Sequence, residues 1–281
     1  MARCLPQRLS VSGAFYFVKI YKLKVHLSFG LYTLTRKRGK RMGFNNTFKR
    51  YEMKYLICDN KKRELEELME KYIEPDKYFH SLIQNIYYDT KDARLIRTSL
   101  EKPAYKEKLR LRCYGTAGKD TPAFIEVKKK YEGIVYKRRV EMEYEKACRY
   151  LNQNFRIVDE KEQILKEIDY FKSFYQELVP AMYISYERDA YHGKDDPDLR
   201  ITFDERILYR KENLALDTKA YGTEILDKGE CLMEIKIADS MPLWLTKIVD
   251  LPYVKKTSFS KYGKAYENEM QKRNIPNERR A

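Results

Sequence analysis

Cysteine and histidine, the residues that build most zinc sites and many nucleophilic active sites, are scarce in this sequence. Its 281 residues include five cysteines and three histidines. No two cysteines form a CxxC pair, and the histidines, at positions 26, 80 and 192, form no cluster in the sequence. A zinc site and a Ser-His-Asp triad are therefore not expected. Scattered cysteines are typical of reduced thiols in a reducing compartment, so we expect a cytoplasmic protein.

Acidic residues are absent from residues 1–43, which contain ten of the lysines and arginines. The apolar stretch 9–34 is broken by three lysines and a histidine, whereas a spanning helix needs about 20 mostly apolar residues. We therefore expect residues 1–43 to be a basic N-terminal extension outside the fold, with a natural start at Met42. A basic segment that binds a membrane surface is the alternative.

A large excess of positive charge is lacking in the rest of the chain. Residues 44–281 hold the other 47 basic residues and all 42 acidic residues, so the net charge of +15 falls to +5 there. Cations therefore matter by their placement, and a diffuse nucleic-acid-binding surface is disfavoured. The sequence shows no internal repeat and no low-complexity linker, and we expect residues 44–281 to form one domain.

Positive charge is concentrated on one predicted strand, residues 105–113. Lysine or arginine occupies every second position there, at Lys106, Lys108, Arg110 and Arg112, and mostly apolar residues alternate with them. Because alternate side chains of a strand share a face, one face is apolar and the other is cationic. Four like charges repel each other unless water or an anion lies between them, so the pattern predicts a polyanion site. Reversing the charge of Arg110 or Arg112 is accordingly expected to stabilise the empty protein.

The same alternation of charged or polar and apolar residues recurs in five other segments. Their charged members include Arg50, Glu52, Lys54, Glu126, Lys128, Lys130, Lys137, Arg139, Glu141, Glu143, Arg200, Asp204, Glu234 and Lys236. A single charged strand face is usually just solvated. Six such strands in one domain favour a sheet that closes on itself around a polar lumen lined with cations and a few carboxylates.

The spacing of apolar residues predicts eight long strands and four helices. The strands are expected at 50–57, 84–89, 105–113, 123–130, 134–143, 182–190, 199–204 and 231–237. The helices are expected near 61–72, 160–178, 242–251 and 260–272. Eight strands are enough for a small closed barrel. We therefore expect an α+β fold: an eight-stranded antiparallel β-barrel tunnel with helices packed outside.

A tunnel lined with lysine and arginine suits phosphate chains, because arginine donates bidentate hydrogen bonds and lysine supplies a compact charge. Glu234, and with less support Glu126 or Glu52, offers hard oxygen ligands to a divalent metal. Such a metal would offset charge during phosphoryl transfer, which needs no nucleophile on the protein. The alternative for each glutamate is an ion pair with a neighbouring lysine.

The ordered set of motifs resembles the VTC domain, the polyphosphate polymerase domain of the triphosphate tunnel metalloenzyme (CYTH-like) superfamily. The resemblance covers about residues 48–265. The matching stretches are Arg50-Tyr-Glu-Met-Lys54-Tyr55, Ile86-Tyr-Tyr-Asp89, Lys108-Leu-Arg110-Leu-Arg112-Cys-Tyr-Gly115, Phe124-Ile-Glu-Val-Lys128, Lys137-Arg-Arg139, Ser185-Tyr-Glu-Arg188, Leu199-Arg-Ile-Thr-Phe-Asp204, Glu234-Ile-Lys236 and Phe259-Ser-Lys261-Tyr-Gly263. Two positions depart from the pattern: Ser258 stands where eukaryotic members tend to have a basic residue, and Arg50 replaces the first glutamate common in the superfamily.

The resemblance implies an antiparallel tunnel that passes the terminal phosphate of ATP to a growing polyphosphate chain with Mn²⁺ or Mg²⁺. It implies a metal ligand at Glu234. The implied catalytic cations are Lys54, Arg110, Arg112, Lys128, Arg188 and Arg200, and the implied substrate-binding residues are Lys137, Arg139 and Lys261. The alternating cationic faces add Lys108 and Lys236 to the expected substrate-binding residues.

The departure at Arg50 favours a polymerase over a hydrolase or a cyclase. A triphosphate or nucleoside triphosphate hydrolase of the same fold and a non-catalytic polyphosphate-binding module remain the alternatives. The expected partners are ATP and polyphosphate, with an unidentified membrane protein as a candidate receiver of the product. No specific nucleic acid is expected, because Tyr105 and Tyr136 alternate away from the cations.

Overall fold

The computed structural model describes residues 51–132, 134–153 and 163–274, all of which belong to one compact unit that spans residues 47–281. The predicted N-terminal extension, residues 1–43, lies outside the described residues. No helix of the described part is long and apolar enough to cross a membrane. The four described cysteines are all free thiols.

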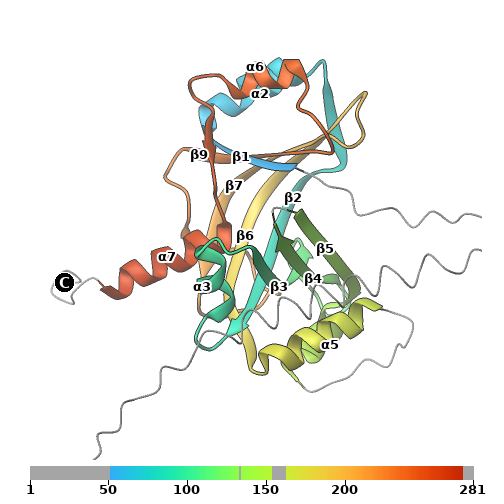
Figure 1. The fold of residues 1–281 in the computed structure, drawn as a ribbon, viewed down its shortest axis with the longest axis vertical. Helices are drawn as coiled ribbons and strands as arrows, with labels where there is room; N and C mark the ends of the chain where they lie inside the picture. Colours follow the sequence, from blue (N-terminus) through green and yellow to red (C-terminus); the bar gives the residue numbers. More distant parts are fainter. Residues whose placement is uncertain (1–50, 133, 154–162, 275–281) are drawn as a thin grey trace, which may run out of the picture. The chain divides into compact units, whose positions relative to one another are not determined.

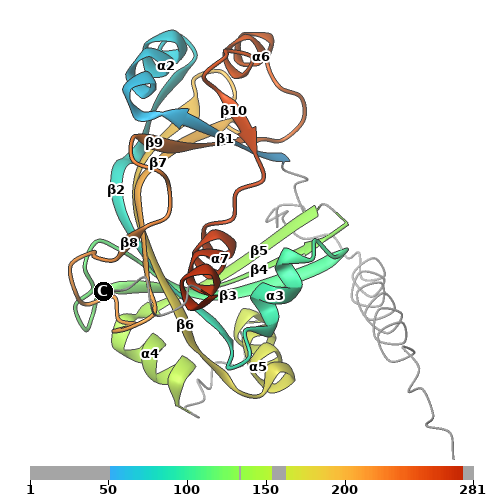
Figure 2. The same cartoon turned by 90° about the vertical axis from the view of Figure 1, so that its left-hand side faces the viewer.

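The described unit is built around one antiparallel sheet (Figures 1 and 2). Its long strands are β1 (Tyr51–Cys58), β2 (Ile73–Thr90), β3 (Tyr105–Tyr114), β4 (Pro122–Tyr131), β5 (Ile134–Glu143), β6 (Leu178–Gly193), β7 (Arg200–Arg210) and β9 (Glu230–Ile237). Two short strands complete it, β8 (Thr223–Glu224) and β10 (Lys255–Thr257). The order across the sheet is β10-β1-β9-β7-β6-β2-β3-β4-β5, with β8 paired to β7.

The prediction of a closed eight-stranded barrel is wrong, because among the described residues the sheet has ten strands and stays open between β10 and β5. All eight predicted long strands exist, and the two extra strands are too short to show an alternating pattern. The sheet bends enough for its two halves to face each other (Figure 2). Side chains then bridge the gap: Lys128 Nζ of β4 lies 3.2 Å from Glu52 Oε2 of β1. The open sheet therefore still has a concave face, and this face carries the charged residues.

The convex face is apolar and is covered by helices at both ends of the sheet. Leu109, Leu111 and Cys113 of β3 are fully buried in one cluster, under α4 (Tyr144–Asn152) and α5 (Gln163–Tyr175). A second cluster joins the apolar residues of β1, β7 and β9 to α2 (Lys62–Met69) and α6 (Leu243–Val249). Burying these side chains is the main drive for folding, and it forces the alternating cations onto the concave face.

The prediction that the helices pack outside is wrong for α7 (Lys261–Asn274), and α3 (Arg94–Leu100), which is not among the four predicted helices, also packs inside. Both contribute to a third cluster, which includes Tyr87 of β2 and Tyr186 of β6 from the concave face. Tyr262 of α7 stacks on Tyr87, with ring centroids 4.7 Å apart. Helix α7 therefore delivers its first turn to the charged face of the sheet.

One buried carboxylate fixes α3 and α7 relative to β2. Asp89 accepts hydrogen bonds from the backbone N–H groups of Leu95 and Ile96 in the first turn of α3, at 2.8 and 3.0 Å. The Tyr262 hydroxyl donates to the same carboxylate at 2.8 Å. Free N–H groups at a helix start need such acceptors, so Asp89 ties the two inner helices to the sheet.

Candidate active site

Three neighbouring strands place their cations in rows across the concave face. Antiparallel pairing sets Lys108 of β3 opposite Lys128 of β4, and Lys128 opposite Lys137 of β5. The next row of the same face runs from Arg110 to Glu126 to Arg139. Directly opposed residues of like charge destabilise a sheet, so the first row favours an anionic ligand.

Glu126 is the centre of the first group of ion pairs. Its side chain is 1% exposed and contacts Arg110 Nη2 at 2.5 Å, Lys137 Nζ at 2.6 Å and Arg112 Nε at 3.8 Å. Burial alone would raise the pKa of Glu126, but Arg110, Arg112 and Lys137 hold it well below its usual range. Arg110 and Arg112 are therefore not unpaired, and the expectation that reversing their charge would stabilise the empty protein is not supported.

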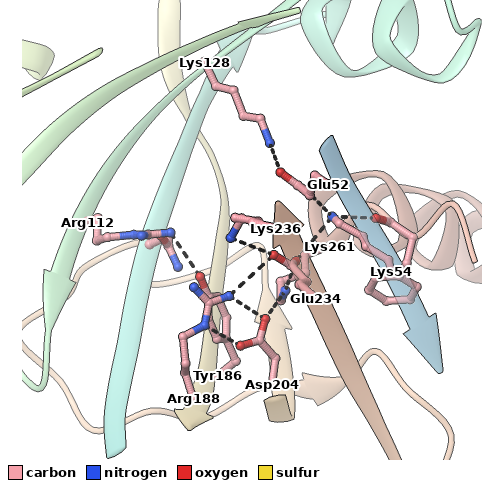
Figure 3. Close-up of polar contacts among 12 residues, drawn as sticks. Glu52, Lys54, Arg112, Lys128, Tyr186, Arg188, Asp204, Glu234, Lys236 and Lys261 are labelled. Atoms are coloured by element: carbon pink, nitrogen blue, oxygen red, sulfur yellow. Dashed lines mark hydrogen bonds and ion pairs between the residues drawn. The ribbon is translucent and has the colours of Figure 1, made fainter. Parts of the chain in front are cut away.

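Glu234 of β9 and Asp204 of β7 form the second group (Figure 3). Lys261 Nζ, from the first residue of α7, lies 2.5 Å from Asp204 Oδ2 and 3.3 Å from Glu234 Oε1. Arg188 of β6 donates two hydrogen bonds to the Asp204 carboxylate, at 2.6 and 2.7 Å. Four separate elements thus meet at two buried carboxylates.

Lysines from β1 and β9 complete this second group. Lys54 Nζ lies 3.3 Å from Glu234 Oε1 and 3.2 Å from Glu52 Oε1, and Lys236 Nζ lies 3.4 Å from Glu234 Oε2. Burial opposes ionisation of Glu52, but Lys128 and Lys54 lower its pKa to about 2. Burial likewise opposes the charge of Lys54, yet Glu234 and Glu52 raise its pKa. Glu234 thus forms ion pairs with neighbouring lysines, and its role as a metal ligand stays a prediction.

Lys108 differs from the other inner cations, because no ion pair joins it to a carboxylate among residues 51–132, 134–153 and 163–274. Its ammonium group contacts the Ser260 hydroxyl at 3.0 Å. Burial lowers the pKa of Lys108 to about 7, and Lys128, Lys54, Lys106 and Arg110 add to this effect. The charged form of Lys108 is therefore disfavoured until an anion reaches it.

Lys137 has a similarly lowered pKa although it touches a carboxylate. Burial brings the pKa of Lys137 to about 7, because the nearby Arg110 and Arg112 offset much of the help from Glu126. Burial also lowers the pKa of Lys236, against the opposing effect of Glu234. The cations of this face greatly outnumber its carboxylates, so each carboxylate is shared by several lysines and arginines.

Tyr186 and Ser260 reach the same region although the sequence analysis assigned them no role. Arg112 Nη2 donates to the Tyr186 hydroxyl at 3.0 Å, and Arg112 Nε donates to Asn85 Oδ1 at 2.9 Å. Burial would raise the pKa of Tyr186, but Arg112, Arg188 and Lys261 lower it. The signal for Tyr186 was present in the sequence, because it stands two residues before Arg188 on one strand and so shares its face.

Two predicted site residues lie apart from these groups. Arg200 is half exposed at the start of β7, and its guanidinium contacts Asp76 at 3.4 Å. Arg139 of the open edge strand β5 lies over the ring of Phe124, 4.8 Å from its centroid. The other ten predicted residues belong to the two groups of ion pairs or lie next to them: Lys54, Lys108, Arg110, Arg112, Lys128, Lys137, Arg188, Glu234, Lys236 and Lys261.

The carboxylates suit a divalent metal by chemistry more than by arrangement. No three His, Cys, Asp or Glu side chains of the described residues come together in a group that could hold a metal ion. Glu234 and Glu52 do share Lys54, and Glu234 and Asp204 share Lys261, so carboxylate oxygens lie close to one another. Mg²⁺ is commonly bound by one or two carboxylates together with substrate phosphates. The donor set fits a metal of that kind.

Comparison of the sequence with known proteins identifies a family. The family model of the VTC domain matches residues 49–269. The chain is also similar to vacuolar transporter chaperone complex subunit 4 of Schizosaccharomyces pombe, with 25% identity over 70% of this chain. It spans about a third (32%) of the length of that curated relative.

Solved structures show more distant similarity. A putative adenylate cyclase from Vibrio parahaemolyticus is 12% identical over 79% of this chain and 99% of its own, with a TM-score of 0.43. A putative adenylyl cyclase from Hippeastrum, described as having a dominant triphosphatase activity, is 13% identical over 77% of this chain and 95% of its own, with a TM-score of 0.42.

Proposed function

The chain belongs to the VTC domain family, and from this premise we propose that it is an ATP-dependent polyphosphate polymerase. One observation carries the proposal: cations outnumber carboxylates on the concave face, and Lys108 has no acidic partner among the described residues. A linear chain of phosphates supplies the missing negative charge at close spacing. ATP and polyphosphate are both anions of this kind.

The reaction is the transfer of one phosphoryl group. A terminal oxygen of the acceptor polyphosphate attacks the γ-phosphorus of ATP, the bond from that phosphorus to the β–γ bridging oxygen breaks, and ADP leaves. Such transfer depends on positioning and on offsetting charge at the equatorial oxygens, so it needs no nucleophile on the protein. Arg110, Arg112 and Arg188 are suited to hold phosphate oxygens by paired donors, whereas Lys54 and Lys261 supply point charges.

Glu234 is the proposed ligand of a divalent metal, Mn²⁺ or Mg²⁺, with a second carboxylate from Asp204, which shares Lys261 with it, or from Glu52, which shares Lys54. When bound, the metal would offset the negative charge that develops on the phosphate oxygens. The chain's own contribution at this position is to keep Glu234 ionised, which Lys261 and Lys54 do by lowering its pKa against the effect of burial.

The test is product analysis with the full chain, ATP and Mn²⁺. A polymer ladder on a gel stained for polyphosphate is the expected result, and Glu234→Gln should abolish it. Glu224→Gln is the matched control, because Glu224 is exposed on β8, outside the groups of ion pairs described above. Release of orthophosphate without polymer would replace the proposal by a triphosphate hydrolase.

A non-catalytic polyphosphate-binding module is the second candidate, favoured by the engagement of Glu234 and Asp204 with four cations. It predicts tight binding of polyphosphate with neither polymer nor orthophosphate formed. Glu234→Gln would then leave binding largely intact, whereas in a polymerase the same change removes turnover.

The similarity to a complex subunit supports a further part of the proposal, namely that this chain works together with a partner protein. Purification of the full chain from its source under mild conditions tests this. We expect the chain to co-purify with a membrane protein and to lose this partner when surface residues are substituted. A chain that elutes alone at its own mass of 33.9 kDa would contradict the proposal.

A further inference from the structure

The cationic face of β3 and β4 extends beyond the residues assigned to the site. Lys106 of β3 lies directly opposite Lys130 of β4, on the same face as Lys108 and Lys128. Lys102 stands just before β3, at the end of α3. We call Lys102, Lys106 and Lys130 the rim lysines.

The rim lysines have no acidic partner in the part of the chain that the structure describes. Lys106 Nζ donates to the backbone oxygen of Ser99 at 3.2 Å, and no ion pair is formed by Lys102, Lys106 or Lys130 there. Burial lowers the pKa of Lys106, and Lys130, Lys102 and Lys128 lower it further. Because Lys106 and Lys130 are directly opposed on the strand pair, their ammonium groups repel each other. A protein gains nothing in the empty state from opposed like charges on a strand pair.

The rim lysines continue the inner site without interruption. Lys106 and Lys108 are two residues apart on one strand, about 6.6 Å along its axis. Lys108 is enclosed near Ser260, Lys128 is 40% exposed, and Lys130 is exposed at the end of β4. The row thus leads from the inner site to the protein surface.

We propose that the rim lysines bind the part of a linear polyphosphate chain that extends out of the inner site. This inference rests on the proposed function and adds the path of the polymer. Lysine suits such a path because its charge is compact and its three donors rotate freely, so the chain can shift by one phosphate without losing a fixed geometry. Phosphate contacts of this kind position a chain and carry no sequence information.

A phosphate chain fits this surface better than a single-stranded nucleic acid. Nucleic-acid grooves combine cations with aromatic side chains on which bases stack. At the rim end of this strand pair the aromatic residues are Tyr105 and Tyr131, which occupy the alternate positions and so lie on the opposite face from the rim lysines. Phe124 and Tyr114 share the cationic face but stand toward the other end of the two strands. The rim offers charge without a stacking surface.

The test compares the affinity of the full chain for tripolyphosphate and for long-chain polyphosphate at two salt concentrations. The variant is Lys102→Gln/Lys106→Gln/Lys130→Gln. The matched control is Lys71→Gln/Lys219→Gln/Lys247→Gln, which removes three exposed lysines from other parts of the fold. Circular dichroism and thermal unfolding check that each variant is folded.

We expect the rim variant to keep its affinity for tripolyphosphate and to lose affinity for the long chain. For single-stranded polyanions each neutralised phosphate adds about 0.7 to the slope of log affinity against log salt, so three lysines add about 2. A fourfold reduction in salt should therefore raise long-chain affinity about 20-fold more in the wild type than in the variant. The control should match the wild type.

Two results would overturn the proposal. One is a rim variant with the long-chain affinity and salt slope of the wild type. The other is single-stranded DNA that binds through the rim lysines and is not displaced by polyphosphate. Failure of the polymerase proposal is distinct, because it appears as absent polymer in the turnover assay while the binding difference between the two triple variants persists.

Discussion

Replacing Lys108 by methionine should stabilise the empty protein, although it removes a polar contact. Lys108 is enclosed on the concave face and has no acidic partner among the described residues, while Lys128 and Lys54 lie nearby. Methionine fills a similar volume with no charge. The variant therefore removes the cost of a buried ammonium group and loses only its contact with Ser260, worth about 1 kcal/mol.

The magnitude follows from the pKa of Lys108. A fall from 10.5 to about 7 corresponds to about 5 kcal/mol as an upper bound. Solvent screening and local rearrangement reduce this bound, so we expect a gain of about 2 kcal/mol at pH 6. The gain should shrink as the pH rises. Between pH 7 and 10.5 the unfolded chain binds more protons at Lys108 than the folded chain does, so the wild type recovers stability by up to about 1.4 kcal/mol per pH unit.

The assay is urea unfolding of wild type and Lys108→Met at pH 6 and pH 9, without phosphate. Lys54→Met is the matched control with the opposite expected sign, because Lys54 lies between Glu52 and Glu234 and its removal leaves both carboxylates short of counter-charge. That control should be destabilised by about 3 kcal/mol. Loss of stability in Lys108→Met at pH 6, or a gain that does not vary with pH, would refute the reasoning. Tripolyphosphate should bind Lys108→Met more weakly at either pH.

Three other predictions concern the carboxylates and the inner helices. Glu126→Gln should destabilise the empty protein by about 3 kcal/mol in urea unfolding, because it removes the counter-charge of Arg110 and its neighbours. Added tripolyphosphate should restore part of the lost stability, and an unchanged unfolding midpoint would contradict the prediction. Glu52, with its pKa lowered to about 2, should contribute up to about 3 kcal/mol above pH 4.5, lost as the pH falls from 4.5 to 2, and Glu52→Gln should flatten that part of the stability curve. Tyr262→Phe removes the hydrogen bond to Asp89 and should lower the free energy of unfolding in urea by about 1 kcal/mol. It should also weaken tripolyphosphate binding, because α7 shifts; unaltered binding would show that α7 is held by packing alone.

The two faces of β3 could be predicted from the sequence, because every second residue of a strand points to the same face. Apolar Leu109 and Leu111 are buried, as predicted, and Lys108 lies on the opposite face. The partners across the sheet could not be predicted in this way. The Arg110–Glu126 pair depends on the register of two strands joined by a loop at 115–121, and a slip of one residue would place Glu126 on the other face.

Whether the sheet closes and where the helices pack could not be predicted from the spacing of apolar residues in the sequence, because both depend on three-dimensional geometry. A barrel needs matching tilt and stagger around all its strands, whereas here β10 has three residues and leaves β5 unpaired within the described part of the chain. The packing of helix α7 on the concave face rests on long-range contacts: Tyr262 bonds Asp89 and stacks on Tyr87, and Ala265 joins the third apolar cluster. Lys261 reaches Asp204 only because of that placement.

The buried carboxylates explain how a site built for polyanions can exist in a folded but empty protein. Glu126, Asp204 and Glu234 offset enough charge for the concave face to form, and their share of the counter-charge leaves Lys108 and Lys137 with lowered pKa values. A phosphate chain must then compete with these carboxylates for the same arginines. Fewer carboxylates would strengthen phosphate binding and weaken the empty fold, and more would do the reverse. The surplus of cations is therefore a compromise: it lowers the stability of the empty protein, and the bound phosphate chain restores that stability.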